Sequence, residues 1–307
     1  MEKVWVTGDA VVDLIPSQND ELLKCPGGAP ANVAVGISRL GGEVGFIGRV
    51  GDDPFGRFIE KVLKSESVGI HYLKKDEVQR TSTVVIDIDD VGERSFTFMV
   101  KPSADQFIVD TDFPSFEENQ WLHACSISLS NEPSRSATLN AMANMKKIGG
   151  NVSFDPNIRE EIWEEENLIR PIILEALALV DVVKFSDDEL IFLTNISELD
   201  EAISYMQDKY QFSLMVITQG KNGSLVVFNN EKKLISGKVV KPVDTTGAGD
   251  AFVGGLLYQL SKNPNWKNDS FIQESIEVAN ACGALATTAK GAMTALPNKE
   301  ALNKFFV

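Results

Sequence analysis

Short runs of β-branched and aliphatic residues alternate along the chain with amphipathic segments, a pattern expected for strands separated by helices. The apolar runs lie at residues 4–6, 44–47, 152–154, 182–184, 214–218 and 224–228. The amphipathic segments lie at residues 31–40, 54–67, 134–148, 168–179, 199–210, 248–260 and 270–288. Proline and aspartate at helix starts and glycine at helix ends support several of them. This repeat predicts a mostly parallel sheet with helices on its faces.

A second pattern interrupts this alternation. Residues 81–89 and 94–100 alternate apolar and polar positions around a connection at 90–93, which predicts a β-hairpin. With residues 11–15 and 21–24, the hairpin is expected to form a small antiparallel sheet. So thin a sheet needs a cover for its apolar face, so we expect either a closing lid or a dimer contact. No repeat or linker divides the chain, which predicts one domain over 1–307 with a lid at about 11–25 and 81–101.

The charge balance excludes several classes of partner. The chain has 29 Lys and Arg against 44 Asp and Glu, a formal net charge of −15, which argues against nucleic acids and anionic membranes. The N-terminus has no signal-peptide pattern, and the most apolar stretch, 168–183, is interrupted by charges short of a membrane span. The three cysteines lack the spacing of a disulfide framework or a zinc site. We therefore expect a cytoplasmic protein with reduced thiols.

The most informative motif is Asp-Thr-Thr-Gly-Ala-Gly-Asp at residues 244–250. Gly247, Ala248 and Gly249 fall at the start of the helix predicted at 248–260, where backbone N–H groups lack intrahelical partners and attract anions. Asp250 follows directly. We interpret it as the general base that takes a proton from an alcohol attacking a γ-phosphate, while the amides hold the phosphoryl oxygens. The alternative is a glycine-rich helix start with an ordinary first-turn acid.

Other phosphate-binding motifs do not fit this chain. A dinucleotide fingerprint would need glycine where Phe252 stands, and the Gly-Lys-Ser/Thr of a P-loop is absent from the sequence. Because the chain is acidic, an anionic nucleotide needs locally positive groups. The candidates beside loop signals are Arg159, Lys184, Lys221 and Lys290.

Several further motifs occur in a consistent order: residues 8–13, 25–32, 92–96, 154–157 with Arg159, 184–189, 218–220, 244–252 and 290–293. Together they resemble the ribokinase-like (PfkB) family of sugar kinases over the whole length, with bacterial fructokinases the nearest likeness. The resemblance implies an α/β fold with a three-layer Rossmann-like parallel sheet and a small antiparallel β lid that often forms a homodimer contact.

The resemblance also implies the reaction. Such kinases transfer the γ-phosphate of MgATP to a sugar hydroxymethyl group, and fructose is the expected acceptor, giving fructose 6-phosphate and ADP. Aminoimidazole riboside or another nucleoside is the alternative acceptor, because kinases of that substrate share nearly all of the motifs. A non-catalytic sugar or nucleotide sensor on the same fold is the alternative from another class.

The resemblance implies a sugar site made of Asp9, Asp13, Gly28, Asn32, Phe98, Arg159 and Asp250. A carboxylate such as Asp13 accepts hydrogen bonds from two hydroxyls, and Gly28 permits close backbone approach. Arg159 follows a predicted strand at the edge where open α/β sheets bind ligands, and its guanidinium suits phosphoryl oxygens. The structural alternatives are a solvent-facing acid for Asp13, hairpin packing for Phe98 and a solvated surface for Arg159.

For the nucleotide, the resemblance implies Lys184, Glu189, Thr218, Gln219, Gly220, Lys221, Gly223, Asn280 and the amides of 247–249. Glu189 is expected to act on Mg²⁺ through water, although Ser186 stands where the family has asparagine and Ser-x-x-Glu is also a capping box. An activating K⁺ is expected beside Asp244 and Thr246, with the carbonyls of Ala286, Ala289 and Gly291. Oxygen ligands of this kind suit a weakly held monovalent cation.

Overall fold

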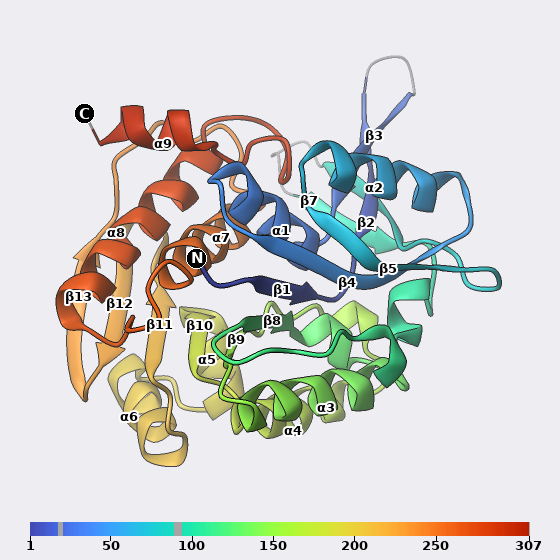
Figure 1. The fold of residues 1–307 in the computed structure, drawn as a ribbon. Coiled ribbons are helices and arrows are strands. Elements are labelled where there is room, and N and C mark those ends of the chain that lie inside the picture. Colours follow the sequence, from blue (N-terminus) through green and yellow to red (C-terminus); the bar gives the residue numbers. More distant parts are fainter. Residues whose placement is uncertain (18–20, 89–93, 307) are drawn as a thin grey trace.

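A computed structural model describes residues 1–17, 21–88 and 94–306 (Figure 1). Its main sheet has nine strands among the described residues, in the spatial order β13-β12-β11-β10-β9-β8-β1-β4-β5. In chain order these strands are Val4–Thr7 (β1), Val44–Gly51 (β4), Gly69–Asp76 (β5), Trp121–Cys125 (β8), Asn151–Asp155 (β9), Val182–Ser186 (β10), Leu214–Thr218 (β11), Gly223–Phe228 (β12) and Glu231–Ser236 (β13). Strand β12 pairs antiparallel with both of its neighbours, β11 and β13, and the other pairings are parallel.

Helices cover both faces of this sheet. They are Ala29–Arg39 (α1), Pro54–Ser65 (α2), Ser134–Lys147 (α3), Glu166–Leu177 (α4), Asp187–Thr194 (α5), Leu199–Lys209 (α6), Ala248–Leu260 (α7), Asp269–Ala286 (α8) and Lys299–Phe305 (α9). Helices α1, α7 and α8 lie on one side and α3 and α4 on the other (Figure 1). The predicted three-layer α/β fold is confirmed, and seven of these helices lie within a few residues of the ranges given above.

The two-residue period of the strands builds a core on each face. In β1, Val4 and Val6 pack with α1, α7 and α8, whereas Trp5 packs on the opposite side with α3 and α4. In β10, Val182 packs in the first of these cores and Val183 in the second, because successive side chains of a strand point to opposite faces. The strand is therefore buried on both sides, as parallel sheets require.

Three strands and the short helix α9 were absent from the prediction, and α5 was expected only as the helix that a Ser186 capping box would begin. Strands β5 and β13 are the two edges of the main sheet, and their charged sequences carry little of the apolar pattern used to find strands. Strand β8 is fully buried, but the polar residue His123 in its middle interrupts the apolar run that would have predicted a strand. The structure places His123 at 1% exposure, with Nδ1 lying 3.1 Å from the Ser153 hydroxyl.

The predicted lid is a separate four-stranded sheet of Val11–Pro16 (β2), Leu22–Gly27 (β3), Thr83–Ile88 (β6) and Arg94–Phe98 (β7). Antiparallel pairings join β2 to β3 and β6 to β7, and a parallel pairing joins β2 to β6. The sheet projects beside α2 (Figure 1). The predicted connection at 90–93, with part of the 92–96 motif, lies outside the described residues.

The carboxyl ends of the parallel strands meet at one edge of the main sheet. The chain turns in opposite directions from β1, toward β4 on one side and toward β8 on the other, which makes the β1–β8 boundary a topological switch point. Open α/β sheets bind ligands in the crevice at such a point. In the described ranges, no helix combines the length and apolar character needed to cross a membrane.

Candidate functional site

A cavity of about 750 Å³ lies at this edge, between the main sheet, the start of α7 and the lid. Thirteen of the predicted site residues line it: Asp9, Asp13, Gly28, Asn32, Phe98, Arg159, Lys184, Asp244, Thr246, Gly247, Ala248, Gly249 and Asp250. The segments that approach it follow β1, β9 and β10 or belong to α1, α7 and the lid. Residues from distant parts of the sequence therefore converge on one volume.

The start of α7 forms one wall of the cavity. Gly247 precedes the helix with a φ of 77°, and a Cβ at this position would lie 2.9 Å from Cα of Ala292. Only glycine enters this left-handed conformation at low cost, so the sequence Gly-Ala-Gly produces the sharp entry into the helix. The Ala248 amide donates to the Thr245 carbonyl at 3.2 Å. Gly247, Ala248, Gly249 and Asp250 line the cavity, and the first turn of a helix offers an anion backbone donors and the positive end of the helix dipole.

Asp250 lies in this first turn and is 9% exposed. The Asn32 side-chain amide, on α1, donates to Asp250 Oδ2 at 2.7 Å. Burial raises the pKa of Asp250, while the Asn32 hydrogen bond and the charges of Lys184 and Arg159 oppose that rise. The result is an oriented, partly desolvated carboxylate at the cavity, which is the condition for a general base.

The sugar side predicted from the sequence surrounds Asp9. Its Oδ1 is buried without a hydrogen-bond partner among the described residues, and Oδ2 would lie 3.0 Å from a Cβ placed on Gly28. Gly28 has a φ of 96° and precedes α1, so glycine brings the backbone close to Asp9. Burial raises the pKa of Asp9 to about 8, and the nearby carboxyl of Asp105 adds to the rise.

The lid contributes Asp13 and Phe98 to the cavity. Phe98 pairs with Val84 across β7 and β6 and packs against the lid's apolar cluster, and it also contacts a cluster of the main domain that includes Ile127. The predicted cavity wall and the structural alternative of hairpin packing therefore coexist at Phe98.

The ends of β9 and β10 form the third wall. Lys184 Nζ lies 2.9 Å from Asp155 Oδ1 and 3.0 Å from Oδ2, and both side chains are at most 10% exposed. Arg159 is exposed, and its guanidinium donates to the Ile158 carbonyl at 2.9 Å. The positive charge predicted at the site is therefore present as one buried ammonium and one exposed guanidinium.

Glu189 lies outside the set of residues that line the cavity. Its carboxylate accepts from the Ser186 amide at 2.8 Å, and the Ser186 hydroxyl accepts from the Glu189 amide at 3.2 Å. The capping box given as the alternative for this pair is therefore confirmed. The other Glu189 oxygen accepts from the Ile158 amide at 3.3 Å, which ties α5 to the segment before Arg159.

The remaining predicted nucleotide residues follow β11 or lie on α8, and they too are absent from the cavity lining. Thr218, Gln219, Gly220, Lys221 and Gly223 form the tight connection between β11 and β12. Asn280 is 8% exposed. The Ser224 hydroxyl donates to Asn280 Oδ1 at 2.7 Å, and Asn280 Nδ2 donates to the Ile235 carbonyl at 3.2 Å. Their nucleotide roles stay predictions.

The loop predicted to hold K⁺ is tied together by Asp244. Asp244 Oδ1 accepts from the Thr246 amide at 3.0 Å and from its hydroxyl at 2.8 Å, and Oδ2 accepts from the Gly291 amide at 2.8 Å. The segment from Ala286 through Ala289 to Gly291 closes α8 and lies beside this loop. Across residues 1–17, 21–88 and 94–306, no group of three His, Cys, Asp or Glu side chains could hold a metal ion.

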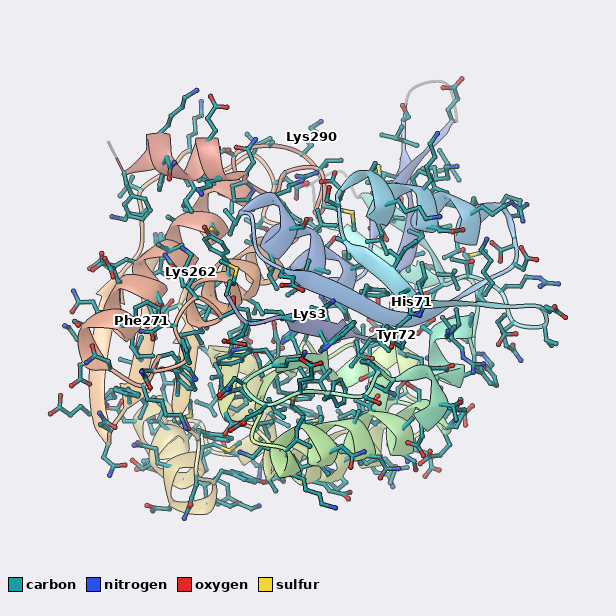
Figure 2. All side chains as sticks on the ribbon, viewed as in Figure 1. Lys3, His71, Tyr72, Lys262, Phe271 and Lys290 are labelled. Carbon is teal, nitrogen blue, oxygen red and sulfur yellow. The ribbon has the colours of Figure 1, made fainter. Side chains whose placement is uncertain are left out.

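Two of the candidate cations, Lys221 and Lys290, and both histidines, His71 and His123, lie outside the cavity lining. Lys221 and Lys290 are exposed and absent from the cavity lining, and Figure 2 shows Lys290 at the upper edge of the molecule. His71 is on the edge strand β5 beside Tyr72, with ring centroids 5.0 Å apart (Figure 2). Burial lowers the pKa of His123 to about 3, so this histidine is neutral.

Sequence reasoning missed several cavity residues. Apolar wall residues come from the lid (Val11, Val84 and Phe96) and from the main domain (Ile127, Val243 and Ala292). Ile127 directly follows β8, so recognising that strand would have placed it at the ligand-binding edge. Asp155 belongs to a quoted motif but received no role, because its partner Lys184 is 29 residues away in sequence.

Comparison with known proteins adds the family. Residues 1–299 match the model of the pfkB family of carbohydrate kinases. The chain belongs to this family. It is 56% identical over 305 residues to a fructokinase of Vibrio alginolyticus, with 99% of each protein covered. It is also 43% identical to an aminoimidazole riboside kinase of Salmonella typhimurium, covering 99% of this chain and 95% of the relative. The predicted family and the predicted class of enzyme, a carbohydrate kinase, are confirmed.

Solved structures agree with this assignment. A fructokinase double mutant from Vibrio cholerae O395, in a form with fructose, ADP and potassium bound, matches with a TM-score of 0.96 and 57% identity over 100% of this chain and 99% of that chain. The aminoimidazole riboside kinase of Salmonella enterica, complexed with its riboside and an ATP analogue, matches with a TM-score of 0.93 and 41% identity, covering 99% of each chain.

Proposed function

We propose that this pfkB family kinase is an ATP-dependent fructokinase, which converts fructose and ATP to fructose 6-phosphate and ADP. The observation that carries the proposal is the position of Asp250. Its carboxylate lies at the helix start that offers amides to a phosphate, and it is bonded to Asn32 from the predicted sugar side. The identity of 56% to a fructokinase over nearly the whole chain supports fructose as the acceptor.

Asp250 acts as the general base in the proposed reaction. It accepts the proton of the fructose hydroxymethyl group as that oxygen attacks the γ-phosphorus in line, and ADP leaves. Asn32 holds the carboxylate in place through Oδ2. The raised pKa of Asp250 suits this role, because a stronger base accepts the proton more readily. The amides at residues 248–250 and Arg159 stabilise charge that develops on the phosphoryl oxygens.

The other cavity residues bind and enclose the substrates. Asp9, Asp13, Gly28 and the Asn32 amide receive sugar hydroxyls, and Phe98 covers the sugar from the lid. Asp9 Oδ1 has no hydrogen-bond partner among the residues that the structure describes, which supports this role, since such a buried oxygen gains a bond when a hydroxyl arrives. A closed lid excludes water and limits ATP hydrolysis. Lys184 and the connection after β11, residues 218–223, meet the nucleotide phosphates, and Asn280 lies on the adenine side.

Two metal ions complete the proposal, and the donor set fits them to different degrees. Mg²⁺ enters with the nucleotide phosphates and usually takes only one or two protein carboxylates, so Glu189, with its oxygens also bonded to backbone amides, would act through water. When bound, Mg²⁺ neutralises phosphate charge. The all-oxygen surroundings of Asp244, Thr246 and the carbonyls of Ala286, Ala289 and Gly291 suit K⁺, which would order the loop before α7.

We further propose a cytoplasmic homodimer of one domain per chain that associates through the lid, with no nucleic-acid or membrane partner. Large apolar side chains on the lid strands are unusually exposed: Leu22 is 51% exposed, Leu23 58% and Phe96 40%. A second copy would remove these surfaces from water. Light scattering of the purified protein tests this, and a monomer at micromolar concentration would contradict it.

The substrate is tested by measuring ADP formation with fructose, ribose, adenosine and aminoimidazole riboside at saturating MgATP. We expect the highest kcat/KM with fructose. A higher value with aminoimidazole riboside would favour that acceptor, which the 43% identity to its kinase makes the second candidate. Fructose binding in calorimetry without ADP formation from any substrate would instead favour a non-catalytic sensor.

A further inference from the structure

The ion pair of Asp155 and Lys184 is nearly removed from solvent. The side chain of Lys184 is 10% exposed and that of Asp155 is 5% exposed, and Nζ contacts both carboxylate oxygens at 2.9 and 3.0 Å. Burial alone would lower the pKa of Lys184, but the carboxylates of Asp155, Glu189 and Asp250 raise it above its ordinary value. The ammonium is therefore charged despite its burial.

The pair has a position that stability alone does not explain. Strands β9 and β10 are neighbours in the main sheet, and Asp155, the last residue of β9, and Lys184, in the middle of β10, both line the cavity. Lys184 Nζ would lie 3.5 Å from a Cβ placed on Gly249, so the ammonium lies over the first turn of α7, one residue from Asp250. A buried ion pair adds little net stability, because desolvation of both charges offsets their attraction.

The hydrogen-bonding capacity of Lys184 leaves room for a ligand. An ammonium has three N–H donors, and its two contacts with Asp155 use at most two of them. A phosphate at the start of α7 would lie within reach of the third donor. Asp155 would then fix the direction of that donor, since an unpaired lysine side chain has many rotamers.

We propose that Asp155 is a positioning residue for phosphoryl transfer, which holds the Lys184 ammonium between the Asp250 carboxylate and the terminal phosphate of the nucleotide. The inference rests on the proposed kinase reaction. In this arrangement Lys184 favours the ionised form of Asp250. The charge of Asp250 raises the pKa of Asp155, and the same repulsion between like charges disfavours the ionised form of Asp250. The other titratable groups that interact with Asp250 are Asp9, Cys125 and Arg159.

The test compares Lys184→Met, Asp155→Asn and the double variant, using ADP formation with fructose over a range of pH. We expect Lys184→Met to lower kcat by about 10²-fold, as removal of one charge-stabilising donor does in other enzymes, and Asp155→Asn to lower it by about tenfold. KM for fructose should stay within about threefold of wild type, because neither group is proposed to bind the sugar.

The pH profile separates positioning from simple structural damage. The acid limb of kcat/KM reports the ionisation of the general base in the free enzyme. It should move to higher pH in Lys184→Met, which removes a cation, and to lower pH in Asp155→Asn, which removes an anion. The double variant removes both charges, so its acid limb should return toward that of wild type while kcat stays low. The same nucleotide is used throughout, so its own titration cancels.

A matched control is the pair of Lys146 and Asp181, which joins α3 to the segment before β10 outside the cavity lining. Lys146→Met and Asp181→Asn should leave the acid limb unchanged. Acid limbs that move in the same direction in both Lys184→Met and Asp155→Asn would overturn the inference, as would kcat of Asp155→Asn within threefold of wild type. The double variant decides the matter if a single variant fails to fold. Absence of ADP formation by wild type would refute the proposed function and the inference with it.

Discussion

Replacing Asp9 with asparagine should make the free energy of unfolding less dependent on pH, because Asp9 is a buried acid with a strongly perturbed ionisation. Its carboxyl is 3% exposed, and burial together with the Asp105 carboxyl raises its pKa from 3.8 to about 8. The folded protein therefore holds a proton that the unfolded chain releases at about pH 4. Stability from this group is complete below pH 4 and is lost as the pH rises to about 8.

The size of the effect follows from the same values. One pKa unit is worth about 1.4 kcal/mol, so the difference between 3.8 and about 8 sets a ceiling of about 6 kcal/mol. Between pH 5 and pH 8 the ceiling is about 4 kcal/mol. Asparagine is neutral throughout this range and has nearly the same shape. Between pH 5 and pH 8, we expect the free energy of unfolding of Asp9→Asn to rise by about 1 to 4 kcal/mol relative to that of wild type.

The assay is urea unfolding of both proteins at pH 5, 6, 7 and 8, with the stability difference plotted against pH. Asp53→Asn is a matched control, because the pKa of Asp53 is shifted in the opposite direction. Burial alone would raise the pKa of Asp53, but hydrogen bonds from Thr81, Gly56 and Phe55 outweigh burial and lower it. That carboxylate caps α2 and stabilises the protein above pH 4. Its loss should cost about 1 kcal/mol, equally at each pH tested. A stability difference for Asp9→Asn that does not grow with pH would refute the reasoning.

Further substitutions test the helix starts at the site. Gly247→Ala should lower the free energy of unfolding by at least about 1 kcal/mol, because alanine is strained at a φ of 77° and its Cβ would lie 2.9 Å from Ala292. Gly249→Ala should fold normally in thermal unfolding but should raise KM for ATP, since its methyl group would face the cavity. If Gly247→Ala and Gly249→Ala lowered the free energy of unfolding equally, the reasoning about the strained backbone at Gly247 would be contradicted. Ser186→Ala should destabilise the protein by about 1 kcal/mol in urea unfolding by removing the cap on the Glu189 amide, and an unchanged midpoint would contradict it.

The sequence was most informative where local pattern and burial agree. The helix at 248–260 and the lid hairpin were predicted nearly to the residue, because glycine punctuation and strict alternation are local signals. The edge strands Gly69–Asp76 and Glu231–Ser236 were missed, since solvent on one side lets charged residues replace the apolar pattern. Recognition of ordered motifs supplied most of the cavity residues, which no single motif would have done.

Contacts between distant segments were the part that sequence could not supply. The bond from Asn32 to Asp250 joins residues 218 apart, and the pairing of Lys184 with Asp155 depends on which strands are neighbours in the sheet. The burial that raises the pKa of Asp9 likewise depends on the packing of the lid and main domain around it. Such properties arise only when the strand order is known.

Turnover of Asp250→Asn tests the account most directly. Asparagine keeps the size of the side chain but cannot accept the proton of the attacking hydroxyl, so kcat with fructose and MgATP should fall by about 10²–10⁴-fold. Calorimetry should show that the variant still binds ATP, and its far-UV circular dichroism should match that of wild type. A kcat within about tenfold of wild type would contradict the assignment of Asp250 as the general base.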